Sequence, residues 1–273
     1  MAVVSFSSWP WPPAVGLLSA SQPRLRVSYF SRQHSSSSLD ETLEAIQNAG
    51  IIACLRAPSA ELAMEAACAA ISGGISVLEI VMSTPGVFEV IQQLVQDHPT
   101  RVIGVGTVLN TNDAKRAMHA GAKFLMSPAM VKDILDYDQA GEALYIPGVM
   151  TPTEILSAHN DGARIVKVYP ISALGGPQYI SALSKPFSHI PMVASQGITL
   201  GTMHMGLKQV FFVDTDSIGE YIAQGASSVV LSDAIFDRMA MSEQNFNGIY
   251  QLAHVAALHG SGAVKQKKRN AIN

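Results

Sequence analysis

Two charged residues lie inside apolar stretches typical of β-strands, and they are the residues best suited to chemistry. Glu79 lies in Val77–Val81, and Lys167 lies in Ile165–Tyr169. Burying either charge without a partner is costly. Two structural explanations remain open: each side chain carries its charge outward to solvent, or the two form a structural ion pair. The functional explanation is that both side chains point into one pocket.

The two residue types together predict covalent chemistry on a ketone. A lysine amine in a dry pocket can be neutral near pH 7 and can then condense with a ketone to form a Schiff base. A nearby carboxylate would move the protons that carbinolamine formation and carbon–carbon cleavage require. One inward lysine and one inward glutamate are the minimum set of a class I aldolase. Because the Schiff base supplies the electron sink, the sequence predicts no metal and no other cofactor.

Short β-branched runs alternate with helical patterns from residue 40 onward. The expected strands are Ile51–Arg56, Val77–Met82, Arg101–Val108, Lys123–Ser127, Leu144–Val149, Arg164–Tyr169, Ile190–Ser195 and Ser228–Ser232. Between them, helical patterns cover Ala60–Ile71, Val87–Val95, Asn112–His119, Thr153–Ala158 and Ser217–Ala223. Glycines stand where left-handed helix ends are expected, at Gly73, Gly121, Gly141, Gly162 and Gly225.

Strands rich in Val and Ile are expected to be parallel and buried on both faces. Eight strand–helix units in about 220 residues predict an α/β fold, a (β/α)8 TIM barrel of the class I aldolase type. A doubly wound open sheet is the alternative. In a barrel, the carboxyl-terminal ends of the strands hold the chemistry, which is where Glu79 and Lys167 are expected to meet.

Seven segments, in order, carry a resemblance to a known family. They are Ile51–Ala57, Ser59–Glu61, Gly73–Ile80, Ile103–Leu109, Ser127–Pro128, Ile146–Glu154 and Val166–Pro170. These segments resemble the 2-keto-3-deoxy-6-phosphogluconate (KDPG) and 4-hydroxy-2-oxoglutarate (KHG) aldolases, and the resemblance spans roughly residues 43–235. It implies that the chain cleaves a 4-hydroxy-2-oxo acid, such as 2-dehydro-3-deoxy-6-phosphogluconate, to pyruvate and an aldehyde such as glyceraldehyde 3-phosphate.

The resemblance also assigns site residues and an assembly. Lys167 becomes the Schiff-base nucleophile and Glu79 the general acid and base. The small keto-acid substrate is expected to contact Thr107, Arg56, Ser83, Pro128, Tyr169, Ser195, Gly197 and Ser232. A homotrimer is implied by the resemblance alone.

The chain departs from the family where an anionic substrate would be held. Ser83 stands where the family usually has a carboxylate-binding arginine, and a hydroxyl cannot replace that charge-assisted bond. Gln196 and Leu231 replace glycines whose absence of a side chain lets backbone N–H groups approach a phosphate. Arg56 could compensate in part. An alternative function is therefore a catalytically weakened barrel that binds a metabolite or a protein partner.

Composition excludes several other classes of protein. Lysine and arginine number 18 against 21 acids, a net charge of −3 that argues against a nucleic-acid-binding protein. The two cysteines, Cys54 and Cys68, form neither a disulfide scaffold nor a zinc site, and Cys54 is expected to pack in or behind the barrel. No apolar run reaches the roughly 20 residues that a membrane-spanning helix needs.

The segments around the barrel, residues 40–262, have their own signatures. Residues 1–39 are basic, serine-rich and free of acids, which predicts a disordered transit peptide for a chloroplast, with a mitochondrion as the alternative. Residues 199–215 form a long apolar connection, interpreted as an insertion that is poorly ordered or a gene-model artefact, with a lid as the alternative. Residues 263–273 are expected to be a solvated basic tail.

Overall fold

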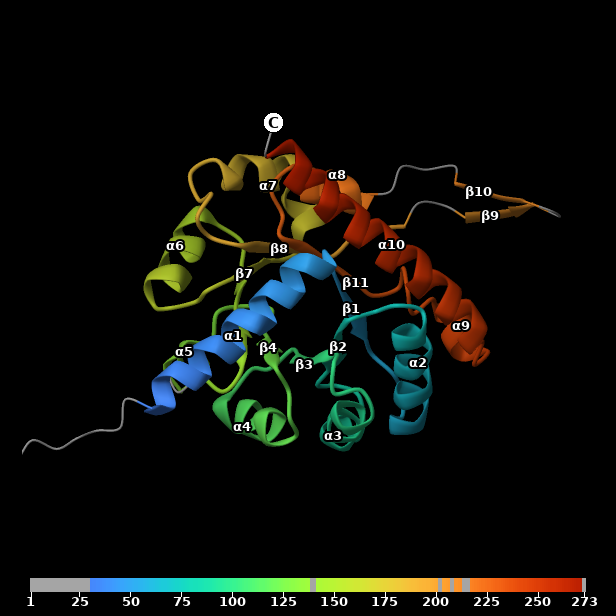
Figure 1. Ribbon diagram of the computed structural model, residues 1–273, viewed down its shortest axis with the longest axis horizontal. Coiled ribbons are helices and arrows are strands. Elements are labelled where there is room, and N and C mark those ends of the chain that lie inside the picture. The colour runs from blue at the N-terminus through green and yellow to red at the C-terminus, as the bar shows by residue number, and fades with distance from the viewer. Residues whose placement is uncertain (1–29, 138–140, 201–202, 207–208, 213–216, 272–273) are drawn as a thin grey trace, which may run out of the picture.

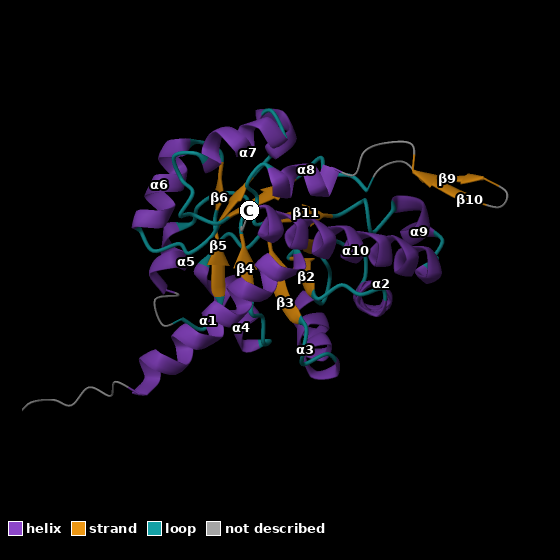
Figure 2. Ribbon diagram, turned by 45° about the horizontal axis from the view of Figure 1, so that its top comes forward, coloured by secondary structure: helices purple, strands orange, loops and turns teal. Residues whose placement is uncertain are grey.

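The computed structural model describes residues 30–137, 141–200, 203–206, 209–212 and 217–271. Parallel strands surround a central axis, and helices cover the outside of the resulting barrel (Figure 1; Figure 2). The strands of the barrel are β1 (Ile51–Leu55), β2 (Val77–Val81), β3 (Val102–Gly106), β4 (Phe124–Met126), β5 (Leu144–Ile146), β6 (Gly148–Val149), β7 (Val166–Val168), β8 (Met192–Ser195) and β11 (Ser228–Leu231). Each lies within an expected strand, so the prediction of a (β/α)8 barrel is confirmed.

The barrel closes through one strand that is interrupted by a proline. The strand order is β5-β4-β3-β2-β1-β11-β8-β7-β6, so β5 and β6 stand at its two ends. Only Pro147 separates them in the chain, and they occupy the single strand expected over Leu144–Val149. Proline has no N–H to donate to a neighbouring strand, which explains the interruption. Its carbonyl still accepts from the N–H of Lys167, which links the two halves to β7.

Helices follow most strands and form the outer layer. They are α2 (Ala60–Ser72), α3 (Val87–Asp97), α4 (Thr111–His119), α5 (Lys132–Tyr137), α6 (Pro152–Asn160), η2 (Ile171–Leu174), α7 (Pro177–Ser184), α8 (Ser217–Ala223), α9 (Arg238–Ser242) and α10 (Phe246–Asn270). Four of the five glycines expected at left-handed helix ends have a positive φ. At the end of α2 the residue with a positive φ is Gly74, and not the expected Gly73. Gly73 is right-handed, and a Cβ there would lie 2.6 Å from the carbonyl oxygen of Tyr250 on α10.

Side chains alternate between two apolar cores along each strand, as the period of two requires. One core fills the barrel and includes Ile52, Val77, Phe124, Met126, Leu144, Ile146, Ile165, Val193 and Val230. The other lies between the strands and the helices and includes Ala53, Leu78, Ile80, Ile103, Val105, Leu125, Val166, Val168 and Leu231. Glu79 and Lys167 fall on the inward face, since each is two residues from a member of the inner core.

Helix α1 (Phe30–Ala49) closes the amino-terminal end of the barrel (Figure 1). Ile46 belongs to the inner core, Leu39 and Leu43 pack against it, and Asp40 forms an ion pair with Arg164. Helix α1 therefore includes residues 30–39 of the expected leader, and Leu39, the last of them, packs against the barrel. Residues 1–29 of that leader lie outside the described residues, so a transit peptide stays a prediction.

The basic segment near the carboxyl terminus belongs to a helix. Helix α10 continues to Asn270, and Lys267 donates from Nζ to the carbonyls of Gly225 and Ala226 at 3.1 and 2.9 Å. Burial lowers the pKa of Lys267. Lys265, Lys268 and Arg269 are exposed, as expected of a solvated basic segment, although they stand on a helix, and Lys267 is half-buried. Among the described residues, no helix is both long and apolar enough to cross a membrane.

The expected insertion contains two short strands. β9 (Met203–Gly206) and β10 (Gln209–Phe212) pair antiparallel in a sheet of their own. They stand away from the barrel in both views (Figure 1; Figure 2). Residues 201–202, 207–208 and 213–216 lie outside the described residues, so the origin of the insertion stays an open prediction.

Candidate active site

A cavity of about 650 Å³ opens at the carboxyl-terminal ends of the barrel strands. In a barrel this end carries the loops that can change without disturbing the fold, so it is where chemistry is expected. The residues lining it that matter here are Cys54, Arg56, Glu79, Thr107, Pro128, Lys167, Tyr169, Ser195, Gln196, Gly197, Val230, Ser232 and Asp233. They come from seven of the barrel strands or from the turns after them.

Glu79 reaches the cavity from the middle of β2 and is 1% exposed. Its carboxylate lies against the bare Cα of Gly106 on β3, where a Cβ would come within 1.5 Å of Oε1. Oε2 is buried and has no hydrogen-bond partner among the described residues. A buried carboxylate oxygen left without a donor is unfavourable. The carboxylate is therefore placed for a partner that enters the cavity.

Lys167 enters the same cavity from β7 and is 8% exposed. Its Nζ lies 5.2 Å from the centre of the Tyr169 ring. Within the described ranges, neither Lys167 nor Glu79 takes part in an ion pair; the pairs found there join Lys132 to Asp161, Arg164 to Asp40 and Arg238 to Asp233. The structure thus rejects both structural explanations, since the two charges neither point outward nor neutralise each other in direct contact.

Cys54 joins the pair from β1, inside the barrel. It stands opposite Glu79 in the register of β1 and β2, and its thiol interacts electrostatically with Glu79, Lys167 and Arg56. Burial, and after it the negative charge of Glu79, raise the pKa of the thiol well above its usual range. The thiol therefore keeps its proton near neutral pH, which makes it a poor nucleophile.

The remaining predicted substrate contacts also line the cavity, with one exception. Thr107 (φ 61°) follows β3, and Pro128, Tyr169, Ser195, Gly197 and Ser232 stand at the ends of their own strands. Arg56 is exposed at the mouth and has no ion-pair partner in the part of the chain that the structure describes. Its guanidinium is thus available to an anion from solvent.

Ser83 is the exception. It is exposed and does not line the cavity, because β2 ends at Val81 and the chain turns away. The neighbouring Thr84 is buried instead, and its Oγ1 accepts from the N–H of Ala57 at 3.3 Å, which ties this turn to the loop after β1. Ser83 thus stands outside the cavity, its contact with the substrate stays a prediction, and Arg56, which lines the cavity, is the better candidate for holding a carboxylate.

Gln196 and Leu231, which stand where the family has glycines, lie in different surroundings. Gln196 lines the cavity with φ 86°, and its Oε1 accepts from the hydroxyl of Ser172 at 3.0 Å. Leu231 is fully buried in the outer core and does not narrow the cavity, contrary to expectation. Val230 faces inward in its place. Side chains alternate along β11, with Val229 and Leu231 pointing outward and Val230 inward. This alternation could have been read from the sequence and would have placed Leu231 outside the cavity.

Asp233 is a residue of the site that the sequence reasoning missed. It lies two residues after β11, lines the cavity, and pairs with Arg238 at 3.4 Å. Its position in a polar turn carries no strand pattern, so only the order of the barrel strands shows that it shares a cavity with Lys167. The described cavity thus carries two cations, Lys167 and Arg56, and two anions, Glu79 and Asp233.

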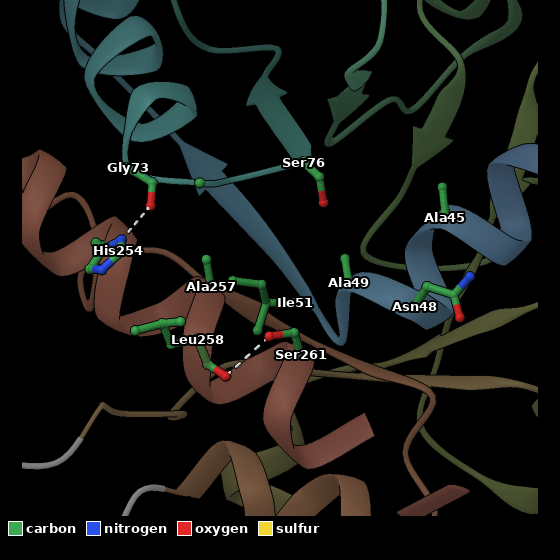
Figure 3. A pocket seen from close by; sticks show the side chains of 11 residues that line it. Ala45, Asn48, Ala49, Ile51, Gly73, Ser76, His254, Ala257, Leu258 and Ser261 are labelled. Atoms are coloured by element: carbon green, nitrogen blue, oxygen red, sulfur yellow. Dashed lines mark hydrogen bonds between the residues drawn. The ribbon is translucent and has the colours of Figure 1, made fainter. Parts of the chain in front are cut away.

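A second cavity, of about 500 Å³, lies at the other end of the barrel, between α1 and α10 (Figure 3). His254 is its one titratable lining side chain in the described chain, and its Nδ1 lies 3.3 Å from the carbonyl oxygen of Gly73. No group there could form a Schiff base. Within the described residues, no set of His, Cys, Asp and Glu side chains is arranged to hold a metal ion.

Fold and site together define a class of protein: a (β/α)8 barrel of the class I aldolase type, with one lysine and one glutamate inside its carboxyl-terminal mouth. The family model described as KDPG and KHG aldolase matches residues 43–249. The chain belongs to this family.

Individual relatives support the assignment. The chain is 35% identical over 131 residues to a 2-dehydro-3-deoxy-phosphogluconate aldolase of Pseudoalteromonas atlantica, a match covering 48% of this chain and 61% of that protein. A protein of the same name from Dickeya dadantii is 32% identical over 155 residues, covering 56% of this chain and 73% of its own length. A KDPG aldolase structure from Legionella pneumophila, with pyruvate captured as a covalent carbinolamine, superposes with a TM-score of 0.68 and 25% identity, covering 80% of this chain and 97% of that one.

Proposed function

We propose that this chain is a class I aldolase that cleaves a 4-hydroxy-2-oxo acid, such as 2-dehydro-3-deoxy-6-phosphogluconate, to pyruvate and an aldehyde, glyceraldehyde 3-phosphate in that case. The observation that carries the proposal is that Lys167 and Glu79 line one cavity, both buried, and form no ion pair with each other. The covalent pyruvate adduct in the Legionella pneumophila relative supports the same chemistry here.

The reaction begins with the amine of Lys167. Its neutral form attacks the C2 carbonyl carbon, and the carbinolamine loses water to give a protonated imine. Glu79 then takes the proton of the C4 hydroxyl, the bond between C3 and C4 breaks, and the aldehyde leaves. The bonding electrons move into the imine and form an enamine. Glu79 returns a proton to C3, and water hydrolyses the imine to release pyruvate and the amine.

The roles of the other residues follow from where they lie. Arg56, exposed and unpaired among the described residues, can hold the carboxylate next to the ketone. Thr107 and Ser195 supply hydroxyls to the cavity wall. Tyr169 places its ring beside the Lys167 amine, an apolar surface that disfavours water there.

Borohydride reduction in the presence of pyruvate tests the proposal. Reduction of an imine leaves a stable carboxyethyl group, and we expect peptide mass spectrometry to find it on Lys167. Lys167→Met should abolish the adduct, whereas Lys123→Met, which removes an exposed lysine at the opposite end of the barrel, should not. A folded wild-type protein without an adduct on Lys167 would support the alternative, a barrel that binds a metabolite or partner without catalysis.

The phosphate group of the substrate needs a test of its own. Gln196 and the Asp233 carboxylate line the wall where the resemblance places the phosphate, and they favour an unphosphorylated aldehyde portion. Comparing kcat/KM for the phosphorylated substrate and for 4-hydroxy-2-oxoglutarate shows which is used. Asp233→Asn should raise kcat/KM for the phosphorylated substrate more than for the unphosphorylated one; an equal effect on both would place Asp233 away from the phosphate.

We further propose that residues 1–39 direct the protein to a plastid, on the grounds of their basic, acid-free composition. A fluorescent protein fused behind residues 1–39 should accumulate in plastids of a plant cell. Accumulation in mitochondria would favour the alternative compartment.

A homotrimer, proposed from the resemblance, should give three times the monomer mass in light scattering.

A further inference from the structure

The thiol of Cys54 has no role in the reaction proposed above, although it stands beside the proposed proton carrier. Cys54 and Glu79 are register partners on β1 and β2, and both side chains line the cavity. Cys54 also packs against the inner core of the barrel. Its position is therefore fixed by the strand and by packing, which is what a residue that orients another must offer.

The surroundings of Glu79 contain few groups able to orient its carboxylate. On β3 its neighbours are Gly104 and Gly106, which have no side chain. The charged or titratable groups that line the same cavity are Cys54 and Arg56 from β1, Lys167 and Tyr169 from β7, and Asp233 after β11. Lys167 is occupied by the substrate during the reaction, and Arg56 lies exposed at the mouth. Thr107 lines the cavity beyond the end of β3, whereas Cys54 is the neutral donor that the strand register sets directly beside Glu79.

We propose that Cys54 is a positioning residue for Glu79: its S–H group donates to the Glu79 carboxylate and holds it toward the substrate carbon that gains and loses a proton. This inference rests on the proposed aldolase function. The carboxylate meets the bare Gly106 on the β3 side, so a side chain that orients it must come from the β1 side, while the unpartnered Oε2 is left for the substrate. The β1 strand places the thiol on that side.

The state of the thiol is consistent with this role. Burial and the negative charge of Glu79 raise the pKa of Cys54, so the sulfur retains its proton over the pH range in which an aldolase works. A protonated thiol is a weak donor, and a thiolate next to a carboxylate would only repel it. The thiol therefore steadies Glu79 without competing with Lys167 for the ketone.

Exchange of the methyl protons of pyruvate in deuterium oxide measures the step in which Glu79 acts. The exchange needs the Schiff base and a base at C3, but it needs no aldehyde, so it does not depend on which substrate is natural. The informative pair of variants is Cys54→Ala and Cys54→Ser, which differ by one hydroxyl donor. Cys68→Ser, at a half-buried site on α2 near His98 and outside the cavity, is the matched control.

We expect Cys54→Ala to lower kcat for exchange about tenfold, with KM for pyruvate little changed. The acidic limb of the rate profile should move up by about half a pH unit, because a donor to the charged carboxylate is lost. Cys54→Ser should restore both, and Cys68→Ser should resemble the wild type. Borohydride trapping on Lys167 should persist in every variant.

Three results would overturn a claim, one of them the aldolase function and two of them the role of Cys54. If wild-type protein shows neither trapping nor exchange, the aldolase function itself fails. If wild-type protein traps and exchanges pyruvate, and Cys54→Ala has the rate and pH profile of the wild type, the role of Cys54 is refuted. If Cys54→Ala and Cys54→Ser lose activity equally while both keep the wild-type melting temperature, the thiol acts by its size and the proposed hydrogen bond is refuted.

Discussion

Gly106 determines whether Glu79 can lie where it does, and Gly106→Ala is the sharpest test of the site. A Cβ at this position would lie 1.5 Å from Oε1 of Glu79, 2.4 Å from Cδ and 2.8 Å from Cγ. Contacts of a real Cβ below 3.0 Å essentially do not occur, so the carboxylate must retreat by about 1.5 Å. The φ of Gly106 lies outside the left-handed region, so alanine strains this contact and not the backbone.

A retreat of this size is large on the scale of catalysis. A misplacement of about 1 Å can cost about 10²-fold in rate, so we expect proton exchange of pyruvate to fall at least about 100-fold, or about 2.7 kcal/mol. Trapping of pyruvate on Lys167 should become slower but should still reach completion, since the amine forms the bond and the carboxylate only speeds the proton transfers. Circular dichroism and the melting temperature should show a folded barrel.

Gly104→Ala on the same strand is the matched control. Its Cβ would lie 2.5 Å from ring atoms of Phe124, which is fully buried in the inner core. Overpacking of this kind costs about 1–3 kcal/mol of unfolding free energy. Gly104→Ala should therefore lower the melting temperature while exchange per folded molecule stays within a few-fold of wild type. If Gly106→Ala exchanges pyruvate protons at the wild-type rate, Glu79 is not the base or does not act from this position.

Three further predictions concern Arg56 at the mouth of the cavity, the Cys54 thiol and the start of α6. Arg56→Gln should raise KM for the keto acid about 10- to 100-fold with a smaller change in kcat, measured by steady-state kinetics, because one charge-assisted hydrogen bond is lost; an unchanged KM would remove Arg56 from the substrate. Alkylation of Cys54 by iodoacetamide should be slow at pH 8 and should accelerate in Glu79→Gln, since burial and then the Glu79 charge raise the thiol pKa; equal rates by peptide mass spectrometry would contradict this. Thr151→Ala should cost about 1 kcal/mol in urea unfolding, because its hydroxyl caps α6 at the N–H of Glu154. The Glu154 carboxylate accepts from the N–H groups of Met150 and Thr151, and these hydrogen bonds lower its pKa. Its contribution to stability is therefore present above the ordinary glutamate pKa and is lost as the pH falls from there through the lowered pKa.

The barrel could be predicted from the sequence because its units are encoded locally. Each strand is a short apolar run, often β-branched, and several of the stretches before a strand end in glycine, so neither feature needs long-range information. The predicted helix over Ser217–Ala223 has the observed bounds, and the predicted strands contain the observed ones. Where the prediction differs, a contact distant in sequence decides. Gly73 is needed for its approach to Tyr250, which no local pattern reveals.

The site was predictable in its charges but not in its fine arrangement. Glu79 and Lys167 stand out because a charge in an apolar strand requires a reason, and the period of two places them inward. That Cys54 and Gly106 flank the carboxylate depends on the register of β1, β2 and β3, which pairs residues 25 or more positions apart. Ser83 stands outside the cavity because the spacing after Glu79 extends past the end of β2, where the direction of a side chain no longer follows the strand.

Among the departures from the family pattern, Gln196 lines the cavity, whereas Ser83 and Leu231 do not. Glu79, Cys54 and Gly106 lie on the adjacent strands β1, β2 and β3, whereas Gln196 and Asp233 lie after β8 and β11. Each loop of a barrel is attached to its own strand, so one side can change while the strands holding the proton carrier stay as they are. A loss of function would leave no pressure to keep a buried, unpartnered carboxylate oxygen, which costs stability. The retained carboxylate and lysine therefore favour working chemistry on a changed aldehyde half over an inactive barrel.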